Sequence, residues 1–321
     1  MPQLNTPITF CIFNRPDVTA RVFNEIARQR PKHLLVIGDG PRPDHPSDPV
    51  QIARARQILD RIDWPCDVRT CFANENMGCG KRMGTGLNWA FDQFEELIIL
   101  EDDCLPHPSF FPYCEALLER FRNDPRVMMI SGNHFQPTTR SHQSYYFSHW
   151  PHIWGWASWR DSWREFNTVQ RPKSELEITT TLSKVFDHDD EVTRWTSIMR
   201  DFFEGKIDTW DFLWTYAIWS RQGLAVLPSQ NLVSNLGFGQ DATHTLNEAS
   251  PLAALQTHDV GPLQHPKTIA RDAVADRWTF ENIMQLKGDA PPAKCLATAS
   301  TKTRSWLRRL LRPKNKRKGQ V

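Results

Sequence analysis

Short apolar runs alternate with helical patterns along the first 135 residues. The runs that predict strands are 8–13, 34–37, 68–72, 97–100 and 127–130, and the segments that predict helices are 18–28, 50–62 and 110–121. The runs 97–100 and 127–130 are apolar at every position, which is typical of strands covered by helices on both faces. This alternation predicts an α/β fold with a doubly wound, mostly parallel sheet.

The pattern changes near residue 136. A tryptophan-rich segment at 150–163 predicts loops, helical patterns follow at 174–186, 190–203 and 209–221, and a β-like stretch covers 224–233. Residues 287–304 are rich in Ala, Pro, Thr and Ser, which predicts a linker. We therefore divide the chain into residues 1–135, 136–286 and 287–321.

Composition narrows the class of protein. Of the 321 residues, 40% are hydrophobic and 24% are charged, as in folded soluble proteins. No apolar run reaches the roughly 18 residues that a membrane-spanning helix needs, and Pro2, Asn5 and Pro7 stand where a signal peptide would carry positive charge. We therefore expect a cytoplasmic protein whose seven cysteines are reduced core thiols.

The net charge of +2 hides a basic tail. Residues 302–318 carry nine Lys or Arg and no acid, so the rest of the chain has 30 basic against 37 acidic residues. An acidic body argues against nucleic acid as a partner. Trp306, Leu307, Leu310 and Leu311 share one helical face of the tail. This face predicts either peripheral contact with the anionic inner surface of a membrane or a flexible solubilising segment.

Three consecutive acids follow the strand predicted at 97–100. Glu101, Asp102 and Asp103 would stand at its carboxyl end, where ligands bind in open α/β sheets. Adjacent carboxylates repel each other unless a cation or hydrogen-bond donors stabilise them, and Mg²⁺ or Mn²⁺ is commonly held by one or two carboxylates together with phosphate oxygens. The cluster predicts a metal–nucleotide site, with a simple turn into the next helix as the alternative.

Polar residues also follow the other predicted strands. They are Asn14 and Arg15 after the first strand, Asp39 after the second, and Asn76, Gly78 and Lys81 after the third. At one edge of a parallel sheet, these groups could face a base, a ribose and a diphosphate. The glycine-rich segment 74–82 lacks the GK[ST] of a P-loop and does not follow the first strand, which argues against P-loop kinases and Rossmann dehydrogenases.

Together, these motifs resemble those of glycosyltransferases with the GT-A fold. The similarity is to the nucleotide-sugar half of N-acetylglucosaminyltransferase I and of bacterial family-two-like enzymes, and it rests on NRP at 14–16, GDG at 38–40, ENMG at 75–78 and EDD at 101–103. The resemblance implies that Asp103 binds the metal and that Glu101 and Asp102 contact the ribose side of the nucleotide. It also implies that Arg15 and Asp39 hold the base.

The resemblance extends to about residue 245. Gly155-Trp156 is similar to the acceptor side of that family, and the segment from Trp210 to Trp214 is similar to its Trp-Asp-Asp-Trp segment, with one more residue and a single acid. The resemblance implies that Trp156 and Trp214 contact the acceptor and that Asp211 is the catalytic base. It also places His244 near the diphosphate, where His244, Lys81 or Arg82 could add positive charge.

The residues around Asp211 give a separate reason to consider it. Formation of a glycosidic bond with inversion needs a group that takes the proton from the acceptor hydroxyl, and aromatic neighbours raise the pKa of an aspartate by desolvation. A first-turn aspartate stabilised by the helix dipole is the alternative, and Asp190, Asp208 and Asp241 are other candidate bases. Tryptophan rings suit sugar faces, although core packing also explains tryptophans.

We therefore predict a metal-dependent, inverting glycosyltransferase. It would move a hexosyl or N-acetylhexosaminyl group from a nucleoside-diphosphate sugar, with a UDP-sugar favoured, to a hydroxyl of a glycan or lipid-linked acceptor. One alternative is a nucleotidyltransferase or phosphoesterase that uses the same acids. The other is a non-enzymatic carbohydrate-binding or scaffold protein on the same fold.

Overall fold

The structure is a computed structural model that describes residues 3–137, 142–238, 252–253 and 255–284. Its strands are β1 (Ile8–Ile12), β2 (His33–Gly38), β3 (Asp67–Phe72), β4 (Glu96–Glu101), β5 (Cys104–Pro106), β6 (Val127–Ser131), β7 (Tyr145–Ser148), β8 (Trp156–Trp159), β9 (Leu224–Pro228) and β10 (Val233–Asn235). Its helices are α1 (Pro16–Gln29), α2 (Asp48–Arg56), α3 (Cys79–Gln93), α4 (Phe110–Phe121), α5 (Arg160–Thr168), α6 (Glu175–Leu182), α7 (Asp189–Phe203), α8 (Asp211–Ser220) and α9 (Ala273–Thr279), with the short helices η1 (Gln57–Arg61) and η2 (Phe280–Met284). The predicted linker and basic tail, 287–321, lie outside the described residues.

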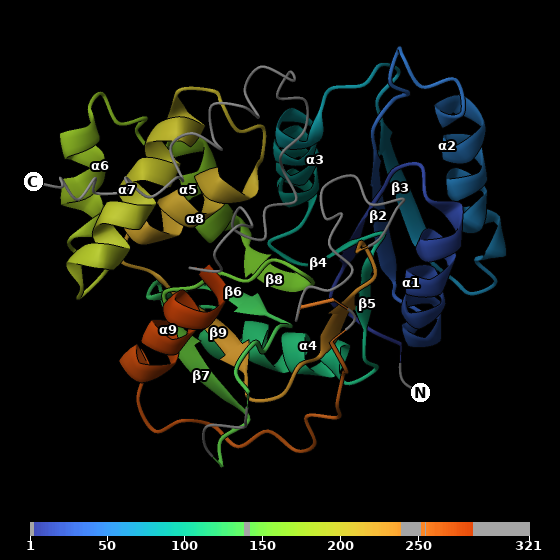
Figure 1. Ribbon diagram of the computed structural model, residues 1–321. Helices are drawn as coiled ribbons and strands as arrows, with labels where there is room; N and C mark the ends of the chain where they lie inside the picture. The colour runs from blue at the N-terminus through green and yellow to red at the C-terminus, as the bar shows by residue number, and fades with distance from the viewer. Residues whose placement is uncertain (1–2, 138–141, 239–251, 254, 285–321) are drawn as a thin grey trace, which may run out of the picture.

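Eight strands form one sheet in the order β3-β2-β1-β4-β8-β6-β9-β7 (Figure 1). β1 pairs in parallel with β2 and β4, β2 with β3, and β6 with β9. β8 runs antiparallel between β4 and β6, and β7 runs antiparallel to β9 at the edge. Six of the eight strands therefore run in one direction, which confirms the predicted α/β fold with a mostly parallel sheet.

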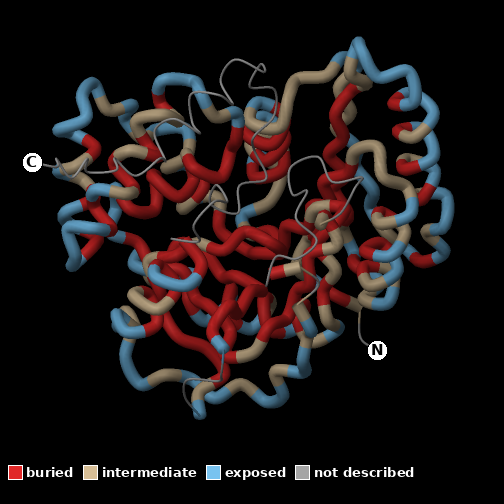
Figure 2. The backbone as a smooth tube through the Cα atoms, viewed as in Figure 1, coloured by how far each residue is buried: buried red, intermediate tan, exposed pale blue. Residues whose placement is uncertain are grey.

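Helices and loops cover both faces of this sheet. Every residue of β1, β6 and β9 is buried, and successive side chains of a strand point to opposite faces. Helix α3 packs on β2 and β4, α4 on β4, β6 and β8, and α5 on β6 and β8. Figure 2 shows the sheet as the buried centre of the molecule. The apolar runs seen in the sequence are therefore core strands.

Helix α3 was not predicted, because its sequence contains three glycines that lower helix propensity. Each glycine allows close packing. A Cβ on Gly80 would lie 2.5 Å from Oδ1 of Asp208, and a Cβ on Gly86 would lie 2.6 Å from Cγ2 of Ile37 in β2. Gly84 similarly faces the ring of Phe166 in α5. The helix therefore forms through tertiary contacts that its local sequence does not reveal.

The prediction of loops at 150–163 was wrong in part, because this segment contains β8 and the start of α5. β8 has four residues, too few for a periodic signal, and it is fully buried between β4 and β6. β7, β8 and β9 all come from residues beyond 135 and complete the same sheet as β1 to β4. The division of roles between residues 1–135 and 136–286 stays a prediction.

Candidate functional site

The carboxyl ends of β1 and β4 bring a cation between two acids. β1 and β4 are parallel neighbours, so Arg15 after β1 and Asp102 and Asp103 after β4 emerge at the same edge of the sheet. The Arg15 guanidinium donates to Oδ1 of Asp102 and, at 3.1 Å, to Oδ2 of Asp103. Both aspartates are buried, whereas Glu101 is partly exposed.

The two aspartates keep the Arg15 guanidinium positively charged. Burial disfavours the charged form of Arg15, but the carboxylates of Asp102 and Asp103 outweigh it and raise the pKa of Arg15 above its ordinary value. Arg15 therefore stays charged, and it neutralises part of the repulsion between the two acids. Arg15 thus supplies both the positive charge and the hydrogen-bond donors that adjacent carboxylates require.

Asp103 is the residue that we expect to hold a divalent cation, and its carboxylate is closely packed by its neighbours. A Cβ on Gly237 would lie 2.3 Å from Oδ2 of Asp103, so the backbone of Gly237 packs directly against this carboxylate and only a glycine fits there. Among the described residues, no three His, Cys, Asp or Glu side chains gather as a complete metal site. Mg²⁺ and Mn²⁺ do not need such a cage, because substrate phosphates and water supply most of their ligands.

Asp39, at the end of β2, holds the loop that follows β3. Its Oδ1 accepts hydrogen bonds from the backbone N–H groups of Gly40 (2.8 Å) and Met77 (2.9 Å), and its Oδ2 accepts one from Nδ2 of Asn76 (3.1 Å). Burial raises the pKa of Asp39, and these hydrogen bonds partly oppose the rise. Asp39 and Asn76 therefore lie at the same edge of the sheet, as predicted, and they are hydrogen-bonded to each other.

Asn14 joins a second buried network at the same edge. Its Nδ2 donates to Oδ1 of Asp48 at 2.7 Å, and Arg42 donates to both oxygens of Asp48, at 2.7 and 2.9 Å. The hydrogen bonds from Arg42 lower the pKa of Asp48 to about 2. The Arg42 guanidinium also lies 5.4 Å from the ring centre of Phe13. This network, which sequence analysis missed, ties the loop after β2 to the end of β1.

The glycine-rich segment ends at the N-terminus of α3. Gly78 has φ +78° and precedes the first residue of the helix, and a Cβ on it would lie 3.0 Å from Oδ2 of Asp208. A carboxylate at this end of a helix is favoured by the helix dipole, which accounts for Asp208 without a catalytic role. Lys81 is exposed, whereas Arg82 is buried and donates to the backbone oxygen of Cys71 at 2.7 Å.

Asp211 lies in a small aromatic pocket. The pocket has a volume of about 60 Å³ and is lined by Phe135, Trp150, Pro151, His152, Ile153, Trp154, Trp195, Asp211, Phe212, Thr215 and Met284. Asp211 is 7% exposed, and the hydroxyl of Thr209 donates to its Oδ1. The backbone N–H of Asp211 donates to the same hydroxyl at 3.3 Å, so the local turn orients the carboxylate. We call this cavity the aromatic pocket.

Two short segments connect the aromatic pocket with its neighbours, one with the acids at the sheet edge and one with the N-terminus of α3. The first contains Gly237, against Asp103, and Phe238, whose ring centre lies 5.7 Å from that of Trp154 in the pocket wall. The second runs from Asp208, at the N-terminus of α3, to Asp211. The two parts of the candidate site therefore adjoin, although their residues lie far apart in the sequence.

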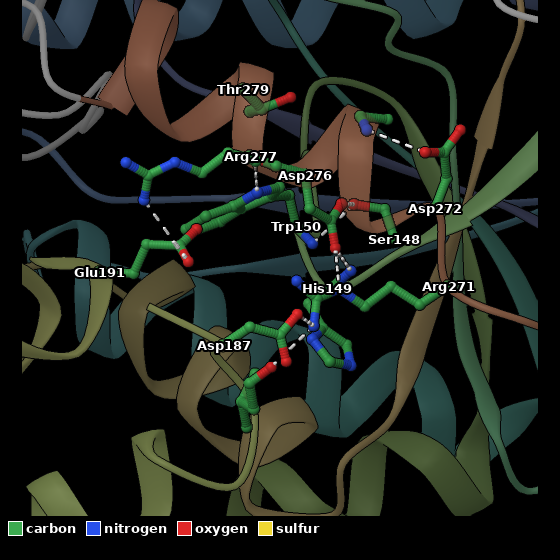
Figure 3. A network of polar contacts seen from close by, with 12 residues as sticks. Ser148, His149, Trp150, Asp187, Glu191, Arg271, Asp272, Asp276, Arg277 and Thr279 are labelled. Atoms are coloured by element: carbon green, nitrogen blue, oxygen red, sulfur yellow. Dashed lines mark hydrogen bonds and ion pairs between the residues drawn. The ribbon is translucent and has the colours of Figure 1, made fainter. Parts of the chain in front are cut away.

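A polar network between β7 and α9 fixes one wall of the pocket (Figure 3). Trp150 donates from Nε1 to the backbone oxygen of Asp276 and from its backbone N–H to Oγ of Ser148, both at 2.9 Å. Asp276 accepts in turn from Ser148 (2.5 Å) and from Nε of Arg271 (2.8 Å). Burial outweighs these contacts and raises the pKa of Asp276 to about 6. This network holds the Trp150 ring in place.

Trp156 and Trp214, which we expect to contact an acceptor, lie in the hydrophobic core of the protein. Both rings are fully buried, and Trp156 lies within 6 Å of Trp163, Trp210 and Trp214, stacking on Trp210 with ring centres 5.7 Å apart. Both tryptophans are therefore packed as core residues in this structure, and their contact with an acceptor stays a prediction.

Several other sequence predictions have definite outcomes. His244 and Asp241 lie outside the described residues. Asp190 pairs with Arg277, through hydrogen bonds of 2.7 and 2.8 Å, and is a surface ion-pair residue. The six cysteines within the described part of the chain are free, in agreement with reduced thiols. No helix among the described residues is long and apolar enough to cross a membrane.

Comparison with known proteins adds limited information. Neither a protein-family model nor a curated protein matches this sequence. Among solved structures, a mannosyltransferase from Pyrobaculum calidifontis in complex with GDP-Man and Mn²⁺ is 16% identical, with a TM-score of 0.34 over 50% of this chain and 46% of that one. This chain thus spans less than half the length of that mannosyltransferase.

Two further structures are similar at comparable scores. UDP-glucose pyrophosphorylase complexed with UDP-glucose is 9% identical, with a TM-score of 0.31 over 53% of this chain and 82% of that one. The 4-diphosphocytidyl-2C-methyl-D-erythritol synthase from Anaerococcus prevotii is 10% identical, with a TM-score of 0.32 over 62% and 84%. Similarities of this size concern the fold and identify no activity.

Proposed function

We propose that this chain is a metal-dependent, inverting glycosyltransferase that uses a nucleoside-diphosphate sugar. The observation that carries the proposal is the cluster of Arg15, Asp102 and Asp103 at the carboxyl ends of β1 and β4, next to a pocket with a buried carboxylate, Asp211. A charged edge suits a diphosphate and a cation, and an aromatic pocket suits a sugar.

The donor would bind at the sheet edge. Asp103 would hold Mn²⁺ or Mg²⁺, which when bound supplies Lewis-acid stabilisation of the leaving diphosphate. Glu101 and Asp102 would face the ribose, and Arg15 would keep Asp102 and Asp103 in position while adding positive charge near the phosphates. The remaining donor contacts that we propose are Asn14, Asp39, Asn76, Gly78, Lys81 and His244.

The acceptor would enter the aromatic pocket. Asp211 would take the proton from the attacking hydroxyl, and the hydroxyl of Thr209 holds the carboxylate in one orientation. Because attack and departure would occur on opposite faces of the sugar, the anomeric configuration would invert. Trp154, which lines the pocket, is a further aromatic contact that we propose for the acceptor.

Thermal unfolding with nucleotides tests the donor site. UDP, GDP, CMP and dTDP are each added with and without Mn²⁺ to wild type, Asp103→Asn and the control Asp92→Asn, whose side chain is exposed on α3. A ligand at a hundredfold its dissociation constant stabilises by about 2.7 kcal/mol, a shift of several degrees for a protein of this size. We expect one nucleotide to give a Mn²⁺-dependent shift that Asp103→Asn loses and Asp92→Asn keeps. The absence of any shift in folded protein would contradict the proposal.

Product analysis separates the remaining enzyme classes. With the sugar form of the nucleotide that binds, a glycosyltransferase releases a nucleoside diphosphate and extends an acceptor, whereas a nucleotidyltransferase consumes a nucleoside triphosphate and releases pyrophosphate. We expect Asp211→Asn to lose transfer while it keeps the nucleotide-induced thermal shift. Retention of full transfer in Asp211→Asn would show that another group is the base.

A further inference from the structure

Two residues that line the aromatic pocket carry buried polar groups that the protein does not satisfy. Nε2 of His152 and Nε1 of Trp195 have no hydrogen-bond partner among the described residues. His152 is 6% exposed and Trp195 is 3% exposed, and both residues line the pocket beside Asp211. Buried polar groups nearly always have partners, and leaving one unsatisfied is costly. The indole nitrogens of Trp156, Trp210 and Trp214 are also without a partner among the described residues, but they lie in the packed core. His152 and Trp195 differ from them because both line one cavity, which points to a ligand there.

Neither ring can turn away to find a partner in the protein. The His152 ring lies 4.3 Å from the ring centre of Phe135, and Oγ of Ser131 donates to the backbone oxygen of His152 at 2.6 Å. Trp195 has ring centres of Trp150 at 5.6 Å and Trp219 at 4.9 Å. The two polar groups are therefore fixed within the aromatic packing before any ligand binds.

The side chains of His152 and Trp195 differ in the hydrogen bonds that they can form. Burial, together with the charge of His134, lowers the pKa of His152 to about 3, so the imidazole is neutral at physiological pH and has one nitrogen that accepts a hydrogen bond. The indole of Trp195 can only donate. A hydroxyl group both donates and accepts, and it is the simplest group that can satisfy either partner.

Charge and size narrow the ligand further. The described residues that line the pocket are largely apolar and none of them is Lys or Arg, so an anionic group would be poorly solvated there and would have no cation to pair with. The volume of about 60 Å³ accommodates a few water-sized groups and not a complete sugar ring. An uncharged edge of a sugar ring, with its hydroxyl or hydroxymethyl groups, meets both conditions.

We propose that His152 and Trp195 are specificity-determining residues that select an uncharged, hydroxyl-bearing edge of the acceptor sugar. His152 accepts a hydrogen bond from one hydroxyl, Trp195 donates to another oxygen, and Trp154 packs against the C–H groups of the ring. This inference rests on the proposed function, because it describes the acceptor of the same reaction. It excludes uronic and sialic acids as the sugar that enters the pocket.

Saturation-transfer NMR titrations of the full chain test the inference. The probes are methyl glycosides of glucose, galactose, mannose and N-acetylglucosamine, each without a carboxyl group, and their anionic counterparts glucuronic, galacturonic and N-acetylneuraminic acid. The variants His152→Phe and Trp195→Phe keep an aromatic ring but remove the polar atom. His258→Phe, at an exposed position, is the matched control.

We expect at least one uncharged glycoside to bind and the anionic probes not to bind. Each pocket variant should weaken that glycoside by about tenfold, which corresponds to about 1.4 kcal/mol, whereas the control should not change it. Binding of the anionic probes as tightly as the uncharged ones would overturn the inference. So would unchanged affinity in both pocket variants, or no glycoside binding in protein that binds a nucleotide.

The same samples separate this inference from the proposed function. The nucleotide-induced thermal shift reports on the donor edge, which the pocket variants should leave intact. Glycoside binding without nucleotide binding would remove the glycosyltransferase proposal and keep the pocket as a carbohydrate site. Nucleotide binding with the wrong glycoside preference would remove only the inference about the pocket.

Discussion

Lowering the pH from about 7.5 to 5.0 should destabilise this protein through two buried histidines. Burial lowers the pKa of His149 to about 4 and that of His152 to about 3. In the unfolded chain both titrate near 6.5. Each neutral histidine therefore contributes fully to the free energy of unfolding above pH 6.5. This contribution is lost as the pH falls toward the pKa of the folded state, because the unfolded chain then binds a proton that the folded chain does not bind.

The magnitude follows from these values. At pH 5.0 each unfolded histidine is almost fully protonated and each folded one is neutral, which costs about 2 kcal/mol per residue. Asp276 acts in the opposite direction. Its pKa in the folded state, about 6, lies above the ordinary 3.8, so on acidification Asp276 binds a proton in the folded state before it does so in the unfolded chain. This increases the free energy of unfolding by about 1 kcal/mol at pH 5.0. The net loss expected for these three groups is about 3 kcal/mol.

Urea unfolding at the two pH values measures this loss. Wild type, His152→Phe and the exposed control His258→Phe are compared, each with itself at the other pH, so that any effect of the substitution on packing cancels. The His152→Phe protein should lose about 2 kcal/mol less than wild type on acidification, and the control should lose as much as wild type. An equal loss in wild type and His152→Phe would refute the conclusion that His152 is buried as a neutral ring.

Three further perturbations test other parts of the structure. Trp156→Ala should lower the free energy of unfolding by about 3–5 kcal/mol in urea denaturation, as for other large core side chains; a loss below about 1 kcal/mol would show that this ring is not core. Asp48→Asn should remove the carboxylate whose pKa the contacts from Arg42 depress to about 2. When the pH falls from 5 to 3, the free energy of unfolding of wild type should therefore decrease by about 1 kcal/mol more than that of the variant. Gly237→Ala should abolish the Mn²⁺-dependent thermal shift with unchanged far-UV circular dichroism, because its Cβ would collide with Oδ2 of Asp103; a normal shift would show that the metal binds elsewhere.

Much of the sheet was predictable because its strands are short, uninterrupted runs of apolar residues. The five apolar runs of the first 135 residues all became strands, and the helix predicted at 110–121 matches α4. A strand buried on both faces must be apolar throughout, and this requirement is visible in a short window of sequence. The acids after β4 and Arg15 after β1 could likewise be assigned to one edge, because parallel strands end together.

The roles of the aromatic residues could not be predicted in this way. Trp154 and Trp156 are two residues apart, yet one lines the aromatic pocket and the other is enclosed by Trp163, Trp210 and Trp214. No local property distinguishes the two rings. Their exposure depends on α5 and α8, which pack against each other from separate parts of the chain.

The sequence alone therefore determined the α/β class, the order of the main elements and the charged edge of the sheet, since each of these depends on residues close together in the chain. Only the tertiary structure decided that β8 enters the centre of the sheet in the reverse direction and that α3 forms despite its glycines. It also decided that His152 and Trp195 share a pocket with Asp211. Those outcomes depend on contacts between residues far apart in the sequence. A local pattern of hydrophobic and polar positions does not specify such contacts.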